Sequence, residues 1–91
     1  MSNEQDLLNS ERILYINTLF NKGEITYGEC EYLKQILRSY NNLNRMKEDL
    51  IYEDEITNMY KINEIDTYIN ISTQTLNKYK ILNFHKKGPT L

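Results

Sequence analysis

The sequence predicts a single all-α domain built from four or five helices. Apolar residues recur at helical spacing along most of the 91 residues, residues typical of helix starts and stops separate these stretches, and no segment has a convincing strand pattern. A chain of this length buries roughly 60–65% of its unfolded surface, which suffices for a modest core but not for an enclosed catalytic cleft. We therefore expect a small helical bundle.

The first two predicted helices, within residues 3–44, form an antiparallel hairpin. Residues 3–20 have one apolar face, made by Leu7, Leu8, Ile13, Ile16, Leu19 and Phe20. Gly23 then favours a helix end, because glycine adopts the left-handed conformation without strain. Thr26 and Glu29 have the spacing of a capping box, with Ile25 placed to pack on Cys30, so a second helix is expected from residue 27 to about residue 40. The connection is short, which places the two helices side by side.

A break is expected at residues 41–44, "NNLN", followed by an acidic helix over residues 45–60. Its apolar residues Met46, Leu50, Ile56 and Met59 are predicted to face inward. Its middle carries five carboxylates and a tyrosine. These residues are Glu48, Asp49, Tyr52, Glu53, Asp54 and Glu55. They form either a solvated helix face or a surface that binds another protein.

Residues 61–83 are predicted to divide into two short helices around Asn70. The stretch "INEIDTYINISTQTLNKY", residues 62–79, resembles a helix-turn-helix motif, with Asn70 in the turn and Ser72 as the N-cap of the second helix. The resemblance implies binding to duplex DNA, because a recognition helix of this kind reads base edges in the major groove. Asp66 stands where the motif has a small residue, so its carboxylate must reach solvent or find a partner.

The implied DNA-binding residues are polar or basic. They are Ser72, Thr73, Gln74, Asn77, Lys78, Lys80, Lys86 and Lys87, the last two within a basic, flexible tail at residues 84–91. Charge is distributed accordingly: residues 1–60 hold 6 Lys/Arg against 11 Asp/Glu, whereas residues 61–91 hold 5 Lys against 2 Asp/Glu. A basic C-terminal third is compatible with phosphate contacts despite the overall charge of −2.

A second, shorter resemblance concerns residues 19–37. The stretch "LFNKGEITYGECEYLKQIL" resembles the helical hairpin of the SHOCT family, with its glycine, Ile-Thr turn, acidic cap and Leu/Lys helix. That resemblance implies a role in association, as in an oligomerising adaptor.

Composition argues against catalysis and against a metal or cofactor. Cys30 and His85 are the only cysteine and the only histidine, so one chain has neither an intramolecular disulfide nor a Cys/His zinc site. Cys30 falls on an apolar stripe, where a buried structural thiol is expected. No glycine-rich phosphate loop and no recognisable carboxylate pair is present.

The expected location is the cytoplasm, because the chain has no long apolar run and its N-terminus lacks the pattern of a secretory signal. The sequence contains no Ala, Val or Trp but 12 Asn, 11 Ile and 8 Tyr, a bias that indicates an A/T-rich genome, such as that of a phage or mobile element.

Two functions follow as hypotheses. The first is a DNA-binding regulator that forms a homodimer through residues 5–40 and reads DNA with the C-terminal motif. The second is a non-enzymatic inhibitor that binds a host or defence protein through the acidic helix, with nucleic-acid mimicry as one form. The eight tyrosines do not decide between them, because they suit either the edge of a core or an interface.

Overall fold

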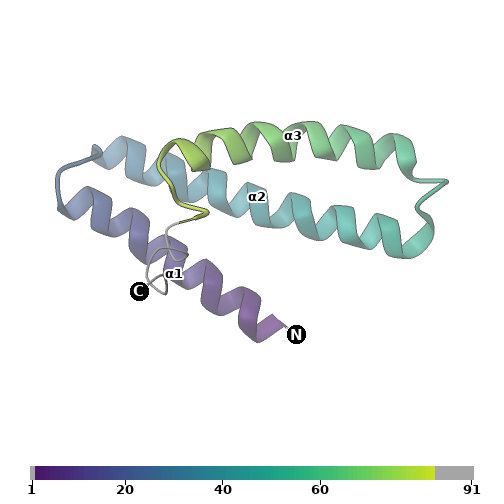
Figure 1. The fold of residues 1–91 in the computed structure, drawn as a ribbon, viewed down its shortest axis with the longest axis horizontal. Coiled ribbons are helices and arrows are strands. Elements are labelled where there is room, and N and C mark those ends of the chain that lie inside the picture. Colours follow the sequence, from purple (N-terminus) through teal and green to yellow (C-terminus); the bar gives the residue numbers. More distant parts are fainter. Residues whose placement is uncertain (1, 84–91) are drawn as a thin grey trace.

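The computed structural model describes residues 2–83, which fold into three helices. They are α1 (Ser2–Asn21), α2 (Tyr27–Asp54) and α3 (Met59–Lys78). The two long helices α2 and α3 form an antiparallel hairpin, and α1 packs against α2 (Figure 1). The molecule is elongated, with extents of 47 × 30 × 20 Å. The all-α class is confirmed, whereas the expected number of four or five helices is wrong.

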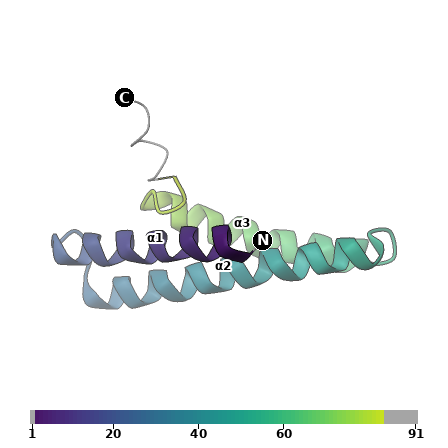
Figure 2. The same ribbon diagram turned by 90° about the horizontal axis from the view of Figure 1, so that it is seen from below.

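The connection between α1 and α2 is built as the sequence predicts. Gly23 takes a φ of +79°, and the amide of Glu24 donates to the carbonyl of Leu19 at 2.9 Å, which ends α1. Thr26 and Glu29 then form the capping box in both directions, at 3.1 and 2.8 Å. The short turn returns the chain alongside α1, so the antiparallel hairpin is confirmed (Figure 2).

The expected break at residues 41–44 is absent, because α2 runs through it without interruption. The asparagine amides there bond within the helical framework. Asn41 Nδ2 donates to Asn9 Oδ1 of α1 at 2.6 Å, and Asn44 Nδ2 donates to the carbonyl of Tyr40 at 2.9 Å. Asparagine is only a modest helix former, and it does not break a helix as proline does. The acidic segment is therefore the last part of α2, which ends at Asp54 rather than near residue 60.

The expected turn at Asn70 is also absent, and residues 59–78 form one helix. Their inward-facing side chains follow one another at spacings of three and four residues: Ile62, Ile65, Ile69, Ser72 and Leu76. This unbroken seam packs along α2, and the packing stabilises helix through Asn70. The two-helix geometry of a helix-turn-helix is thus replaced by a straight element.

The hydrophobic core lies at the end of the molecule that holds the α1–α2 connection. Its fully buried side chains come from every helix and from the segment after α3: Ile16, Leu33, Leu37, Leu76 and Ile81. Lys80 takes a φ of +61°, and the amide of Ile81 donates to the carbonyl of Leu76 at 3.0 Å. This reversal of the chain inserts Ile81 and Leu82 into the core. Cys30 is buried there as a free thiol, as expected.

Within residues 2–83, none of the three helices is both long and apolar enough to cross a membrane.

Candidate functional site

The end of the α2–α3 hairpin, residues 46–65, extends beyond α1 and is called the hairpin tip (Figure 1). Only two helices and their connecting turn form it. The six residues proposed for partner binding all lie here and are all exposed: Glu48, Asp49, Tyr52, Glu53, Asp54 and Glu55. The tip therefore gathers the acidic candidates on one free end of the molecule.

Two side chains shape the turn at the tip. Asp54 accepts a hydrogen bond from the Thr57 hydroxyl at 2.8 Å and one from the Thr57 amide at 3.4 Å. These bonds lower the pKa of Asp54, because they stabilise its ionised form. Asn58 Nδ2 donates to the carbonyl of Leu50 at 3.0 Å, which ties the start of α3 to the last turns of α2. The turn is thus held by local hydrogen bonds rather than by a core.

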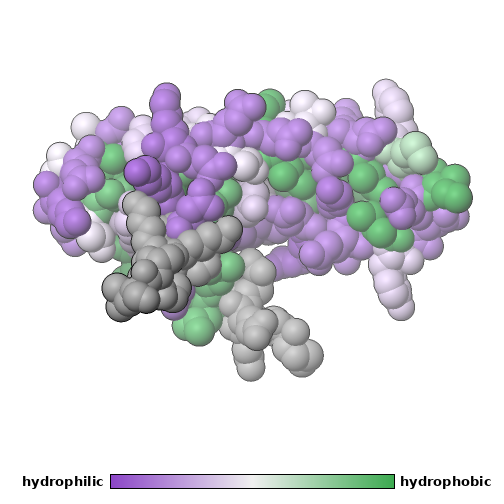
Figure 3. All heavy atoms as spheres, in the orientation of Figure 1, coloured by the Kyte–Doolittle hydropathy of each residue, from purple (hydrophilic) through white to green (hydrophobic). Residues whose placement is uncertain are grey.

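Large apolar side chains stand out from this acidic end. Tyr52, Tyr60 and Ile56 are 93%, 83% and 80% exposed, and Figure 3 shows hydrophobic residues among hydrophilic ones at the corresponding end. Met46, Ile56 and Met59 were predicted to face inward, which is wrong: Ile56 lies in the turn, and Met46 and Met59 are each 51% exposed. Within the part of the chain that the structure describes, no third helix covers these side chains. Exposed apolar side chains gathered in one place are typical of interaction surfaces.

A shallow groove of about 510 Å³ runs between α2 and α3 at the tip. Its apolar floor is made by Met46, Leu50 and Ile65. Charged side chains surround the floor, namely Asp49, Glu53, Lys61 and Glu64. The residues of α2 that face α1, such as Asn41 and Arg45, lie on another side of that helix, so α1 does not cover this groove.

A second groove, of about 430 Å³, continues along the same side of the hairpin toward the core. It is lined by Ile36, Ser39, Asn42, Leu43, Tyr68, Ile71 and Ser72. Positions 36, 39, 43, 46, 50 and 53 of α2 follow the helical spacing of one face, which places the two grooves on the same side of α2. Tyr68 and Ile71 are more than half exposed at its edge.

An ion pair joins the two helices behind the tip. Lys47 Nζ lies 2.7 Å from Asp66 Oδ1, and both side chains are about one-third exposed. Asp66 has therefore found the partner that its position required. A partly exposed ion pair of this kind contributes only about 0–1 kcal/mol to the stability of the fold. Because Lys47 is paired with Asp66, its positive charge does not neutralise the carboxylates of the tip.

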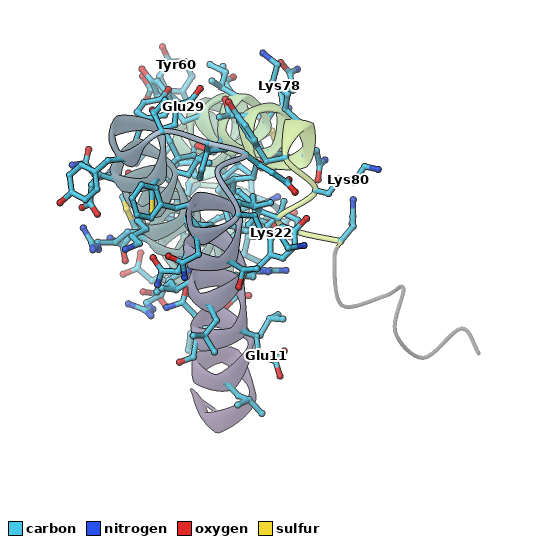
Figure 4. The ribbon with its side chains drawn as sticks, turned by 90° about the vertical axis from the view of Figure 1, so that its left-hand side faces the viewer. Glu11, Lys22, Glu29, Tyr60, Lys78 and Lys80 are labelled. Atoms are coloured by element: carbon cyan, nitrogen blue, oxygen red, sulfur yellow. The ribbon has the colours of Figure 1, made fainter. Side chains whose placement is uncertain are left out.

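Because α3 is one continuous helix, the proposed DNA-binding residues within it lie on different faces. Ser72 is only 7% exposed and packs toward α2, so it is neither an N-cap nor free to contact a base. Thr73 is half-buried, whereas Gln74, Asn77 and Lys78 share an exposed face. Lys78 and Lys80 point away from the body of the molecule in Figure 4. Lys86 and Lys87 lie outside the described residues.

The apolar part of the candidate site was not predicted. Ile56 and Met59 were assigned to the inward face of one helix, because the sequence pattern alone does not say how far α1 extends along α2. The signal present was the crowding of apolar residues around all sides of residues 50–60, which is more than one buried stripe requires.

Comparisons with protein-family models, with curated proteins and with solved structures find no match for this chain. Within residues 2–83, no three His, Cys, Asp or Glu side chains are grouped closely enough to hold a metal ion, the carboxylates of the tip included. Interpretation of the tip therefore depends on its own charge, shape and exposure.

Proposed function

We propose that the chain is a non-enzymatic binding protein whose hairpin tip docks on a basic surface of another protein. The observation that carries this proposal is the exposure of Tyr52, Ile56 and Tyr60 within a cluster of carboxylates. Exposing apolar groups of this size to water is unfavourable, and burying a Tyr or Ile side chain at an interface releases that cost.

The charge of the tip defines the partner. Its carboxylates are Glu48, Asp49, Glu53, Asp54, Glu55 and Glu64, against only Lys47 and Lys61. Lys47 is engaged by Asp66, and hydrogen bonds from Thr57 stabilise the ionised form of Asp54. A surface this acidic attracts a basic partner over several ångströms and accelerates encounter at low salt. Nucleic-acid-binding sites of proteins are basic surfaces of this kind, which favours a host or defence protein with such a site.

The grooves on the hairpin add shape to charge. An apolar floor bordered by Asp49, Glu53 and Glu64 suits apolar side chains flanked by Lys or Arg. An amphipathic basic helix of the partner presents that combination, and helix-in-groove binding is a common mode of recognition. The exposed tyrosines of the tip, Tyr52 and Tyr60, then add rigid anchors with little conformational entropy to lose.

The test begins with capture of partners on the immobilised full chain, followed by affinity measurements with each purified candidate. Glu53→Lys combined with Glu55→Lys should weaken binding by about 100-fold or more, since two attractive charges become repulsive. Glu11→Lys combined with Glu24→Lys changes the net charge equally at exposed positions away from the tip and is the matched control. A partner that binds both double variants alike does not use the tip.

A matched pair of tyrosine variants tests the apolar contribution. Tyr52→Ser with Tyr60→Ser should weaken binding by roughly 10-fold or more, because anchor residues at interfaces contribute 1–2 kcal/mol or above. Tyr32→Ser, exposed on the first half of α2, should leave affinity unchanged. Unaltered affinity in the tip variant would remove the tyrosines from the proposed interface.

DNA binding is the second candidate, favoured by the exposed row Gln74, Asn77 and Lys78 with Lys80 just beyond. Fluorescence anisotropy with random duplex DNA should then show affinity that falls steeply with salt, as phosphate contacts require. Gln74→Ala with Asn77→Ala should relax sequence preference and preserve non-specific affinity. Absence of binding at low salt would reject DNA binding and would leave docking on a protein as the proposed function.

A further inference from the structure

All three arginines of the sequence lie in the space between α1 and α2. Arg12 comes from α1, and Arg38 and Arg45 come from α2. The two helices diverge toward the N-terminus of α1, as Figure 1 shows, and two adjoining hollows fill the angle between them. The hollows share Asn41 and Arg45, and together they are called the α1–α2 cleft.

The cleft is lined chiefly by polar side chains. The larger hollow, about 300 Å³, is lined by Leu8, Arg12, Tyr40, Asn41, Asn44, Arg45 and Glu48. The smaller, about 140 Å³, adds Asn9, Lys34, Arg38 and Asn42, with Ile13 and Leu37 at its base. Asn41 and Asn44 each use one amide hydrogen in a bond to protein, which leaves the second hydrogen of each available.

Arg12 is the buried cation of the cleft. It is 8% exposed, and its Nε has no hydrogen-bond partner. The ion pairs found among residues 2–83, Lys34–Glu31 and Lys47–Asp66, do not include it. Burial lowers the pKa of Arg12, while Tyr40 acts in the opposite direction. A guanidinium nevertheless stays protonated at neutral pH, so a charge is buried without an ion-pair partner among the described side chains.

An unpaired buried charge is unfavourable, and an anion that pairs with it removes the penalty. The planar guanidinium donates two parallel hydrogen bonds to an oxyanion, the arrangement that phosphate and carboxylate accept. Arg12 and Arg45 line the larger hollow together with a single carboxylate, that of Glu48, and Arg38 lines the smaller one. Lys34, in the smaller hollow, is already paired with Glu31. The excess of positive charge favours an anion with more than one negative charge.

We infer that the α1–α2 cleft binds a small phosphate-bearing anion, held by Arg12 and Arg45. The site adjoins the hairpin tip at Glu48, but neither Arg12 nor Arg45 belongs to the tip or to the exposed lysines at the end of α3, so the inference does not depend on either proposed function. Glu48 borders the site, and because its carboxylate repels the anion, it weakens phosphate binding.

Inorganic phosphate and pyrophosphate are the probes, titrated into the full chain at constant ionic strength with chloride as the reference. Amide resonances of residues near Arg12 and Arg45 should shift in a saturable way. The melting temperature should rise with phosphate concentration, since a ligand that binds only the folded state stabilises it. Responses equal to those of chloride would overturn the inference.

Variants separate binding from folding. Arg45→Gln, at an exposed position, should weaken phosphate binding by roughly tenfold or more, the usual effect of removing a charge-assisted hydrogen bond. Arg12→Met removes the buried charge at similar volume, so without phosphate its melting temperature should equal or exceed that of wild type, and phosphate should no longer raise it. Lys22→Gln, an exposed lysine of the α1–α2 connection, is the control and should bind phosphate like wild type.

Two results would reassign the cleft. If phosphate binds only to the Glu48→Gln variant, Glu48 itself is the internal counter-ion and the inference fails. If a single-stranded oligonucleotide displaces phosphate with much higher affinity, the cleft belongs to a nucleic-acid surface and the small-anion assignment fails. If wild type binds phosphate and the Glu48→Gln variant binds it more tightly, the inference is supported.

Discussion

Asp54 and Arg12 show how differently two charged residues are treated in this protein. Asp54 is fully exposed and has its charge satisfied by Thr57. Arg12 is buried, and its Nε has no hydrogen-bond partner. The first side chain stabilises a turn, whereas the second is tolerated in the fold at a cost. Charged residues that cost stability are typical of binding sites, which is why the cleft and not the turn suggests a ligand.

The pH dependence of the turn follows from the lowered pKa of Asp54. Because its folded-state pKa lies below the ordinary value of 3.8, its stabilising contribution is fully present above that value and is lost as pH falls through the folded pKa. The difference in unfolding free energy between wild type and Asp54→Asn should therefore shrink as pH is lowered from 5 toward 2. Denaturant titrations at several pH values measure it. A constant difference would mean that the Thr57 bonds do not depend on the charge.

The capping box makes a second prediction for single residues. Thr26→Ala removes the side chain that accepts from the amide of Glu29, and should lower stability by about 1 kcal/mol. Thr18→Ala is the control, because Thr18 is exposed within α1 and its hydroxyl bonds only to the carbonyl of Leu14. Thermal melts should show a lower melting temperature for the first variant and little change for the second. Equal melting temperatures would show that the cap adds nothing.

At the scale of elements, local chemistry could be predicted and long-range packing could not. Gly23 and the pair Thr26–Glu29 end and begin helices by bonds to their own neighbours, and both were predicted correctly. The breaks at residues 41–44 and at Asn70 were inferred from asparagine, which permits a turn without requiring one. Whether such a residue stays helical depends on the seam between α2 and α3, and residues far apart in sequence form that seam.

The dependence on long-range packing also explains why the candidate site was predicted only in part. The acidic residues of the tip were identified from composition, which needs no knowledge of packing. The exposure of Ile56, Tyr60 and Met59 depends on how far α2 extends past α1, and this is set by the merging of two expected helices into one of 28 residues. The gathering of Arg12, Arg38 and Arg45 likewise needs the pairing of α1 with α2 in register.

Asn70 tests the continuity of α3. In the middle of a helix, Asn70→Ala should raise stability by roughly 0.5 kcal/mol, because alanine is the better helix former. In a turn with positive φ, the same change should lower stability by about 1 kcal/mol or more. Asn63→Ala, at another exposed position of α3, is the matched control and should also be stabilising. Urea unfolding measures the change in unfolding free energy for each variant. Changes of opposite sign would indicate a turn at Asn70.

For the whole molecule, the essential feature is the separation of the core from the tip. The fully buried residues lie where α1, α2 and the end of α3 meet, whereas the tip has only two helices and a turn held by local hydrogen bonds (Figure 2). One long helix, α2, passes through both regions. Opening of the tip therefore disrupts few buried contacts, while opening of the core requires unfolding of the whole chain.

Hydrogen exchange should reveal this gradient along α2. Amides of residues 30–37 should exchange at the rate of global unfolding, and amides of residues 48–54 should exchange roughly tenfold or more faster. A partner that docks on the tip should slow exchange there and leave the core unchanged, whereas phosphate in the α1–α2 cleft should protect residues near Arg45. Uniform protection along α2 would mean that the tip opens only with the core. Slowing confined to the C-terminal part of α3 would instead identify that end as the binding surface.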